Sequence, residues 1–145
     1  MLRELYAYLT AVSLTGLIAA VMLLAACASA PGPSGTARVT GTVLYRERIA
    51  LPPDAIVTVQ LQDVSRQDVA ATVLAEQVIR TEGRQVPFSF ALEYDPAAIQ
   101  SNHRYVVRAT IRSGDTLLFT TTQSYPVLGA DGLSNAEIVV QRVGA

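Results

Sequence analysis

The 145-residue sequence has no lysine and no tryptophan, and it contains one cysteine and one histidine. Without lysine it cannot form a phosphate-binding loop of the Gly-x-x-x-x-Gly-Lys type. One cysteine and one histidine cannot supply the usual ligands of a zinc site, so no metal and no cofactor are expected. A Ser-His-Asp triad would have to use His103, and no Gly-x-Ser-x-Gly motif accompanies it. These absences argue against an enzyme.

The charge is nearly balanced, with a formal net charge of -1. Beyond residue 26, ten arginines face eleven acidic residues, and no stretch of the chain gathers the basic residues into a cluster. A nucleic-acid partner would need such a basic patch. The sequence therefore predicts no nucleic-acid binding.

The polar candidates for chemistry have simpler explanations. His103 stands among polar residues, which is typical of an exposed turn. The carboxylates Asp63, Glu93 and Asp95 lie near strand ends, where such groups usually cap turns or face solvent. The alternative is a carboxylate pair for glycoside cleavage. It lacks support because the chain has no tryptophan to stack on a sugar ring.

The only cysteine closes a long apolar run, in the motif Leu24-Ala25-Ala26-Cys27. These four residues resemble a bacterial lipobox, which implies cleavage before Cys27 and attachment of lipid to its sulfur and freed amine. Leu24, Ala25 and Ala26 would be the residues that signal peptidase recognises. The alternative is an uncleaved helix, because the run from Leu5 is long enough to span a bilayer. Ala28 follows the cysteine where an aspartate would signal inner-membrane retention, so the outer membrane, facing the periplasm, is expected.

Three regions follow from this reading. Residues 1–26 are the lipoprotein signal peptide. Residues 27–36 hold the lipidated cysteine and a flexible tether of proline, glycine and small residues. Residues 37–145 form one domain, which is long enough for a single core.

In this domain the apolar residues mostly alternate with polar ones, which predicts strands. About seven short strands are expected in a small antiparallel β-sandwich, an all-β fold. Residues 69–80 have mixed propensity, and a strand over residues 72–80 is preferred to a helix. Residues 117–125 are expected to form one strand ended by Pro126, and the last strand should run to Arg142. The residues predicted to be buried are Leu61, Phe90, Leu92 and Val107.

Two local features complete the prediction. Asp95 and Pro96 should begin one short helical turn, because aspartate caps helices and proline suits their first position. Arg46, Glu47 and Arg48 interrupt the first alternating stretch with charge. They are expected at a solvated sheet edge, where charge discourages strand addition. The alternative is that this edge docks a partner.

Several strings resemble the YbaY/YscW family of bacterial envelope lipoproteins. They are GTVLYRERIALPPDA (41–55), VTVQLQDVS (57–65), GRQVPF (83–88), YDPA (94–97) and YPVL (125–128). The resemblance covers the domain from Gly41 to about Val143. It implies a small β-sandwich fixed to the outer membrane. YscW-type members act as lipoprotein chaperones, or pilotins, for the secretins of secretion systems, and this sequence looks closer to the YbaY type.

Two hypotheses follow for the function. The first is a lipid-anchored, non-enzymatic binding or chaperone-like domain that acts on another envelope protein, such as a secretin. The second is a periplasmic module that binds a saccharide or another small ligand. An exposed apolar groove between strands would favour the first, and a polar pocket with aromatic walls would favour the second.

Overall fold

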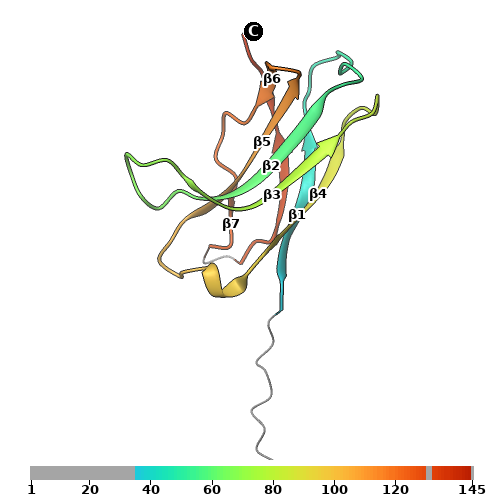
Figure 1. Cartoon of the computed structure of the whole chain (residues 1–145). Coiled ribbons are helices and arrows are strands. Elements are labelled where there is room, and N and C mark those ends of the chain that lie inside the picture. The colour runs from blue at the N-terminus through green and yellow to red at the C-terminus, as the bar shows by residue number, and fades with distance from the viewer. Residues whose placement is uncertain (1–34, 130–131, 145) are drawn as a thin grey trace, which may run out of the picture. The chain divides into compact units, whose positions relative to one another are not determined.

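The computed structural model describes residues 35–129 and 132–144 (Figure 1). The region from Gly35 onward forms one compact unit. The proposed signal peptide and most of the tether lie outside the described residues. Within them, no helix combines the length and apolar character that a membrane crossing requires.

Two β-sheets form the domain, as the alternating pattern predicts. The smaller sheet has the strand order β4 (Phe88–Tyr94), β1 (Ala37–Leu44) and β8 (Asn135–Val139). The larger sheet has the order β3 (Thr72–Arg80), β2 (Ile56–Asp63), β5 (Tyr105–Ser113), β6 (Thr116–Thr120) and β9 (Gln141–Arg142). The short strand β7 (Pro126–Val127) pairs with β5 beside β6. The all-β sandwich is therefore confirmed, including a strand over residues 72–80.

One strand pair departs from the antiparallel expectation. β1 and β8 run parallel, with Val43 opposite Ile138, whereas the other strand pairs of the described chain are antiparallel. A tight hairpin can join only antiparallel neighbours, and no hairpin joins these two strands because they lie far apart in the sequence. Nothing in the alternating pattern of either strand encodes its direction.

The core fills the space between the two sheets. All four residues predicted to be buried are buried: Leu61 and Val107 from the larger sheet, Phe90 and Leu92 from the smaller sheet. Tyr45 and Phe119 stack in the same core with ring centroids 4.4 Å apart. Because one face of each strand supplies this core, the opposite residues of the larger sheet form an outer face.

The C-terminal half of the domain breaks two predicted strands. Residues 117–125 do not form one strand, since β6 ends at Thr120 and Pro126 begins β7 instead of ending a strand. Proline fits this position at the start of a short strand. The predicted last strand is also divided: β8 belongs to the smaller sheet and β9 to the larger one. Val140 lies at the crossing, where its backbone N–H donates to the Leu44 carbonyl at 2.9 Å.

The short helical turn is present as predicted. A 3-10 helix covers Pro96–Ala98, and the Asp95 carboxylate accepts a hydrogen bond of 2.8 Å from the Ala97 backbone. This turn leads into the polar loop that precedes β5 and carries His103.

Candidate functional site

The sequence-predicted site residues fall in two places. Leu24, Ala25, Ala26 and Cys27 lie outside the described residues, so lipidation stays a prediction. Arg46, Glu47 and Arg48 lie in the loop after β1.

The structure places Arg46–Arg48 in a loop and not on an edge strand, and whether these residues dock a partner stays a prediction. β1 is the central strand of the smaller sheet, and the three residues follow its end as an exposed loop. Charge breaks the alternating pattern equally well in a loop and at an edge, which is why the sequence did not separate the two. The edges of the sheets are β4 and β8 in the smaller sheet and β3 and β9 in the larger one.

The most distinctive surface feature is a detour of the chain beside β5. The Thr121 N–H donates to the Ala109 carbonyl at 3.1 Å, and the Val107 N–H donates to the Tyr125 carbonyl at 3.0 Å. Between these two bonds, residues 122–124 leave the sheet and are exposed. The segment between Thr121 and Tyr125 therefore has more residues than the part of β5 that it faces. The extra residues bulge outward from the sheet.

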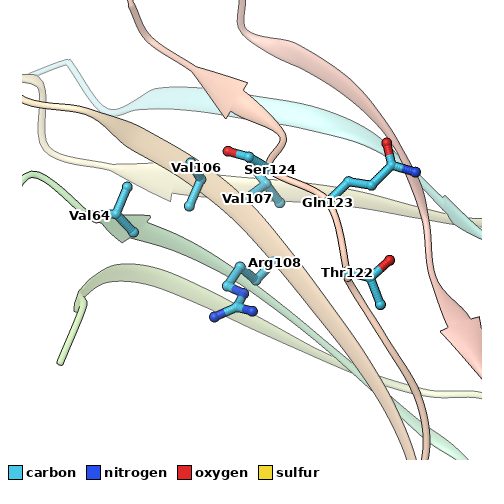
Figure 2. A pocket seen from close by; sticks show the side chains of 7 residues that line it. All are labelled: Val64, Val106, Val107, Arg108, Thr122, Gln123 and Ser124. Atoms are coloured by element: carbon cyan, nitrogen blue, oxygen red, sulfur yellow. The ribbon is translucent and has the colours of Figure 1, made fainter. Parts of the chain in front are cut away.

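A hollow of about 240 Å³ lies between this detour and β5 (Figure 2). Residues of β5 and Val64 line one side, and the polar residues of the detour line the other. The lining residues are Val64, Val106, Val107, Arg108, Thr122, Gln123 and Ser124.

Two further hollows adjoin the first on the larger sheet. One of about 170 Å³ shares Val64, Val106 and Ser124 with it and continues past Pro126 to His103 and Arg104. The other, of about 220 Å³, shares Arg108 and runs over polar side chains of β2, β5 and β6. Together the three hollows make one shallow groove, which we call the β5 groove. Its apolar end lies near Val106 and its polar end near Gln60.

Arg108 stands where the apolar and polar parts of the β5 groove meet. It is exposed, and its guanidinium forms no ion pair with any residue that the structure describes. Beside it in the polar part, the side-chain oxygen Oε1 of Gln62 is buried and accepts no hydrogen bond from the described chain. The groove therefore holds an exposed cation without an ion-pair partner and, beside it, an acceptor without a donor, both within the described chain.

His103 and Asp63 form an unexpected pair at the apolar end. The imidazole Nδ1 lies 2.6 Å from Asp63 Oδ2, and the Ser65 hydroxyl and N–H both donate to Asp63 Oδ1. The pKa of Asp63 is lowered to about 2, chiefly by the hydrogen bond from the Ser65 hydroxyl and to a smaller extent by the Ser65 N–H and by His103. The sequence placed His103 in a turn and Asp63 near a strand end, but nothing in it showed that the two residues meet.

The carboxylates and the histidine considered as candidates for chemistry each have a contact that the structure describes. The His103 ring contacts the Asp63 carboxylate and bonds to no serine hydroxyl within the described residues, which also contain no group of three metal-ligating side chains. Of the other two carboxylates considered for glycoside cleavage, Glu93 forms an ion pair with Arg38 on the smaller sheet and Asp95 caps the 3-10 helix.

Comparison with known proteins agrees with the β-sandwich fold. The family model described as "Type III secretion system lipoprotein chaperone (YscW)" matches residues 34–140. A curated relative from Escherichia coli (strain K12), "Uncharacterized lipoprotein YbaY", is 47% identical over 94 residues, which is 65% of this chain. The match spans 50% of the length of that relative.

A solved structure is similar as well. The structure described as that of an alternative pilotin from the type II secretion system of Vibrio cholerae is 43% identical, with a TM-score of 0.73. The similarity covers 77% of this chain and 100% of the pilotin chain. The matched family segment includes nearly all of the described domain, and the chain therefore belongs to the YscW family of lipoprotein chaperones.

Proposed function

We propose that this protein is a lipid-anchored, pilotin-like chaperone that binds a secretin-like protein of the bacterial outer membrane. The observation that carries the proposal is the 43% identity, with a TM-score of 0.73, to a pilotin whose whole chain is matched. The lipoprotein-chaperone family points the same way. Binding in this role is non-enzymatic, and it needs a surface rather than a reaction centre.

The anchor is part of the proposal. Lipid on Cys27 would hold the domain on the periplasmic face of the outer membrane, and residues 28–36 would act as the tether. Membership of a lipoprotein family supports an envelope location, and the alanine after Cys27 supports the outer membrane. A chaperone anchored in this way raises the local concentration of its partner at the membrane where the partner assembles.

The alternative of a saccharide- or small-ligand-binding module finds less support. A hollow of about 380 Å³ lies near Arg46 and Glu47, within the size range of small-molecule sites. Tyr125 is the single aromatic residue in its lining, and the hydroxyl of that tyrosine is already bonded to the backbone of Val139. A saccharide site with stacking aromatic walls is therefore absent from this hollow.

The proposal is tested by isolating the partner from cells. The full-length chain with a C-terminal tag is crosslinked in intact cells and purified from the membrane fraction. We expect an oligomeric outer-membrane protein to co-purify, and we expect less of that protein to reach the outer membrane when the gene for this chain is deleted. Normal assembly of every co-purified protein in the deletion strain would contradict the proposal. The Cys27→Ser variant serves as the matched control, because it separates binding from anchoring.

A further inference from the structure

We infer that the β5 groove is the partner-binding surface, and that it takes a short protein segment in which a carboxylate stands beside apolar side chains. This inference rests on the proposed function for the kind of partner, an envelope protein. It adds the surface, the chemistry of the bound segment and the residue that recognises it.

The charge of the outer face gives the first argument. Strand register aligns three cross-strand rows over β3, β2 and β5: Arg80–Ile56–Arg112, Val78–Thr58–Thr110 and Glu76–Gln60–Arg108. A fourth row contains Val73, Gln62 and Val106. In β2 and β5 the residues between these rows are buried in the core, and in β3 Ala75 and Ile79 are partly buried against it, so the rows themselves form the outer face.

These rows hold three arginines and one glutamate. The glutamate, Glu76, already accepts a hydrogen bond from Gln60 Nε2. The face is therefore locally basic on a chain whose formal net charge is -1. A basic face on an otherwise balanced protein complements an acidic partner, and such complementarity selects partners and raises their association rate.

The shape and lining of the groove give the second argument. Lipid headgroups would offer anionic charge as well, but they would not need an apolar channel. Here the channel beside Arg108 has apolar walls from Val64 and Val106, and it continues past Pro126. A bound segment with apolar side chains on each side of a carboxylate would fit this groove. Its apolar side chains would fill the channel while its carboxylate contacts the Arg108 guanidinium. The charge-assisted bond would be partly shielded from water and thus stronger than on a flat surface.

The unsatisfied acceptor gives the third argument. Gln62 Oε1 is buried in the polar part of the groove without a hydrogen-bond donor among the described residues. Buried polar atoms are nearly always bonded in a folded protein. The Gln62 side chain is only half-buried, and by rotating toward the groove it would let a backbone N–H of the bound segment supply the missing donor. Arg108 would therefore bind a carboxylate and Gln62 an N–H, and one peptide segment carries both groups.

Photo-crosslinking of the full-length chain in cells tests this inference. The photoreactive amino acid benzoylphenylalanine is placed at Ser124, on the wall of the groove, or at Glu47, in the loop after β1. We expect an adduct from position 124 and none from position 47. Sequencing of the crosslinked peptide should find an aspartate or glutamate flanked by apolar residues.

Charge reversal then tests the role of Arg108. Arg108→Glu, combined with the probe at position 124, should lower the adduct yield about tenfold, because it removes an ion pair and adds a repulsion. Reversal of the partner's carboxylate to arginine should restore the yield. Arg46→Glu is the matched control, since it reverses an exposed arginine of the loop after β1, and it should leave the yield unchanged. Arg108→Gln should give a smaller loss, and melting curves of both Arg108 variants should match that of the wild type.

Several outcomes would overturn the inference while leaving the proposed function intact. They are adducts from position 47 alone, an adduct at position 124 that Arg108→Glu does not change, and a crosslinked segment without a carboxylate. Adducts to lipid, or to a second copy of this chain, would overturn it equally. If no adduct forms at either position and no envelope protein co-purifies with the tagged chain, the proposed function itself fails.

Discussion

The hydroxyl of Tyr125 bonds both backbone groups of Val139. It accepts a hydrogen bond of 2.9 Å from the Val139 N–H and donates one of 3.0 Å to the Val139 carbonyl. Val139 ends β8 in the smaller sheet, and two residues later β9 begins in the larger sheet. Tyr125 itself ends the detour beside β5. One phenol therefore fixes the crossing between the sheets and one wall of the β5 groove.

Removal of this hydroxyl should destabilise the domain. In Tyr125→Phe the Val139 N–H and carbonyl both lose their partner, and a partly buried unsatisfied group costs about 1–3 kcal/mol. We expect a loss of stability in that range, measured by urea unfolding at neutral pH. Tyr94→Phe is the matched control, because the Tyr94 hydroxyl forms no hydrogen bond within the described residues and Tyr94 is also half-buried. Equal stability of the two variants would show that the Tyr125 bonds contribute nothing.

Gly41 should tolerate no side chain. A Cβ atom at this position of β1 would lie 1.8 Å from the Ala136 carbonyl oxygen of β8 and 2.8 Å from the ring of Phe90. The carbonyl belongs to the backbone and cannot rotate away, so β8 would have to move. We expect Gly41→Ala to cost about 3 kcal/mol or more, at the upper end of the range for overpacked cores. Gly35→Ala is the control, since a Cβ there meets nothing within 4 Å. Similar urea midpoints for the two variants would contradict the close approach of β1 and β8.

The low pKa of Asp63 predicts a stability change in acid. The carboxyl has a pKa of about 2 in the folded protein and an ordinary value of 3.8, so folding favours its ionised form. The stabilisation is complete above pH 3.8 and is lost as the pH falls towards 2. Asp63→Asn should therefore lower the melting temperature at pH 5, and the difference from the wild type should shrink as the pH approaches 2. The control is Asp115→Asn, because the Asp115 carboxylate forms no hydrogen bond within the described chain. A difference from the wild type that stays constant with pH would exclude this role for Asp63.

The core residues and the short helical turn are the parts of the fold that the sequence predicts best. Alternation fixes which side chains point inward, and Leu61, Phe90, Leu92 and Val107 are buried as it predicts. The helical turn at Asp95 was also predictable, because its capping depends on neighbours in the chain.

Long-range relationships were not predictable in this way. The parallel pairing of β1 with β8, the contact of His103 with Asp63 and the detour before Tyr125 each join segments that are distant in sequence or interrupt a regular strand. The alternation of β5 puts Arg108 on an outward position of its strand. That it faces a groove depends on residues 122–124, whose bulge leaves no mark on the alternating pattern.

The final prediction is that lipid on Cys27, and not the protein surface, holds the molecule on the membrane. The basic rows of the larger sheet carry only three arginines, and the described domain has no amphipathic helix to lie in a bilayer. Each buried acyl methylene contributes about 0.8 kcal/mol, and two or more chains give stable anchoring. Wild-type protein should incorporate radioactive palmitate, and Cys27→Ser should remain an unlabelled precursor.

A fragment that begins at Ala28 behind a cleavable secretory signal completes the test of the anchor. It lacks both the cysteine and the apolar run, but it retains the whole described domain. We expect osmotic shock to release it as a folded protein whose circular dichroism spectrum is that of β-structure. If the fragment instead sediments with membranes, Arg108→Glu identifies the cause: release by this variant would mean that the basic face binds anionic lipid. Sedimentation that the variant does not change would require another membrane-binding surface. In both cases the lipid would no longer be the sole anchor.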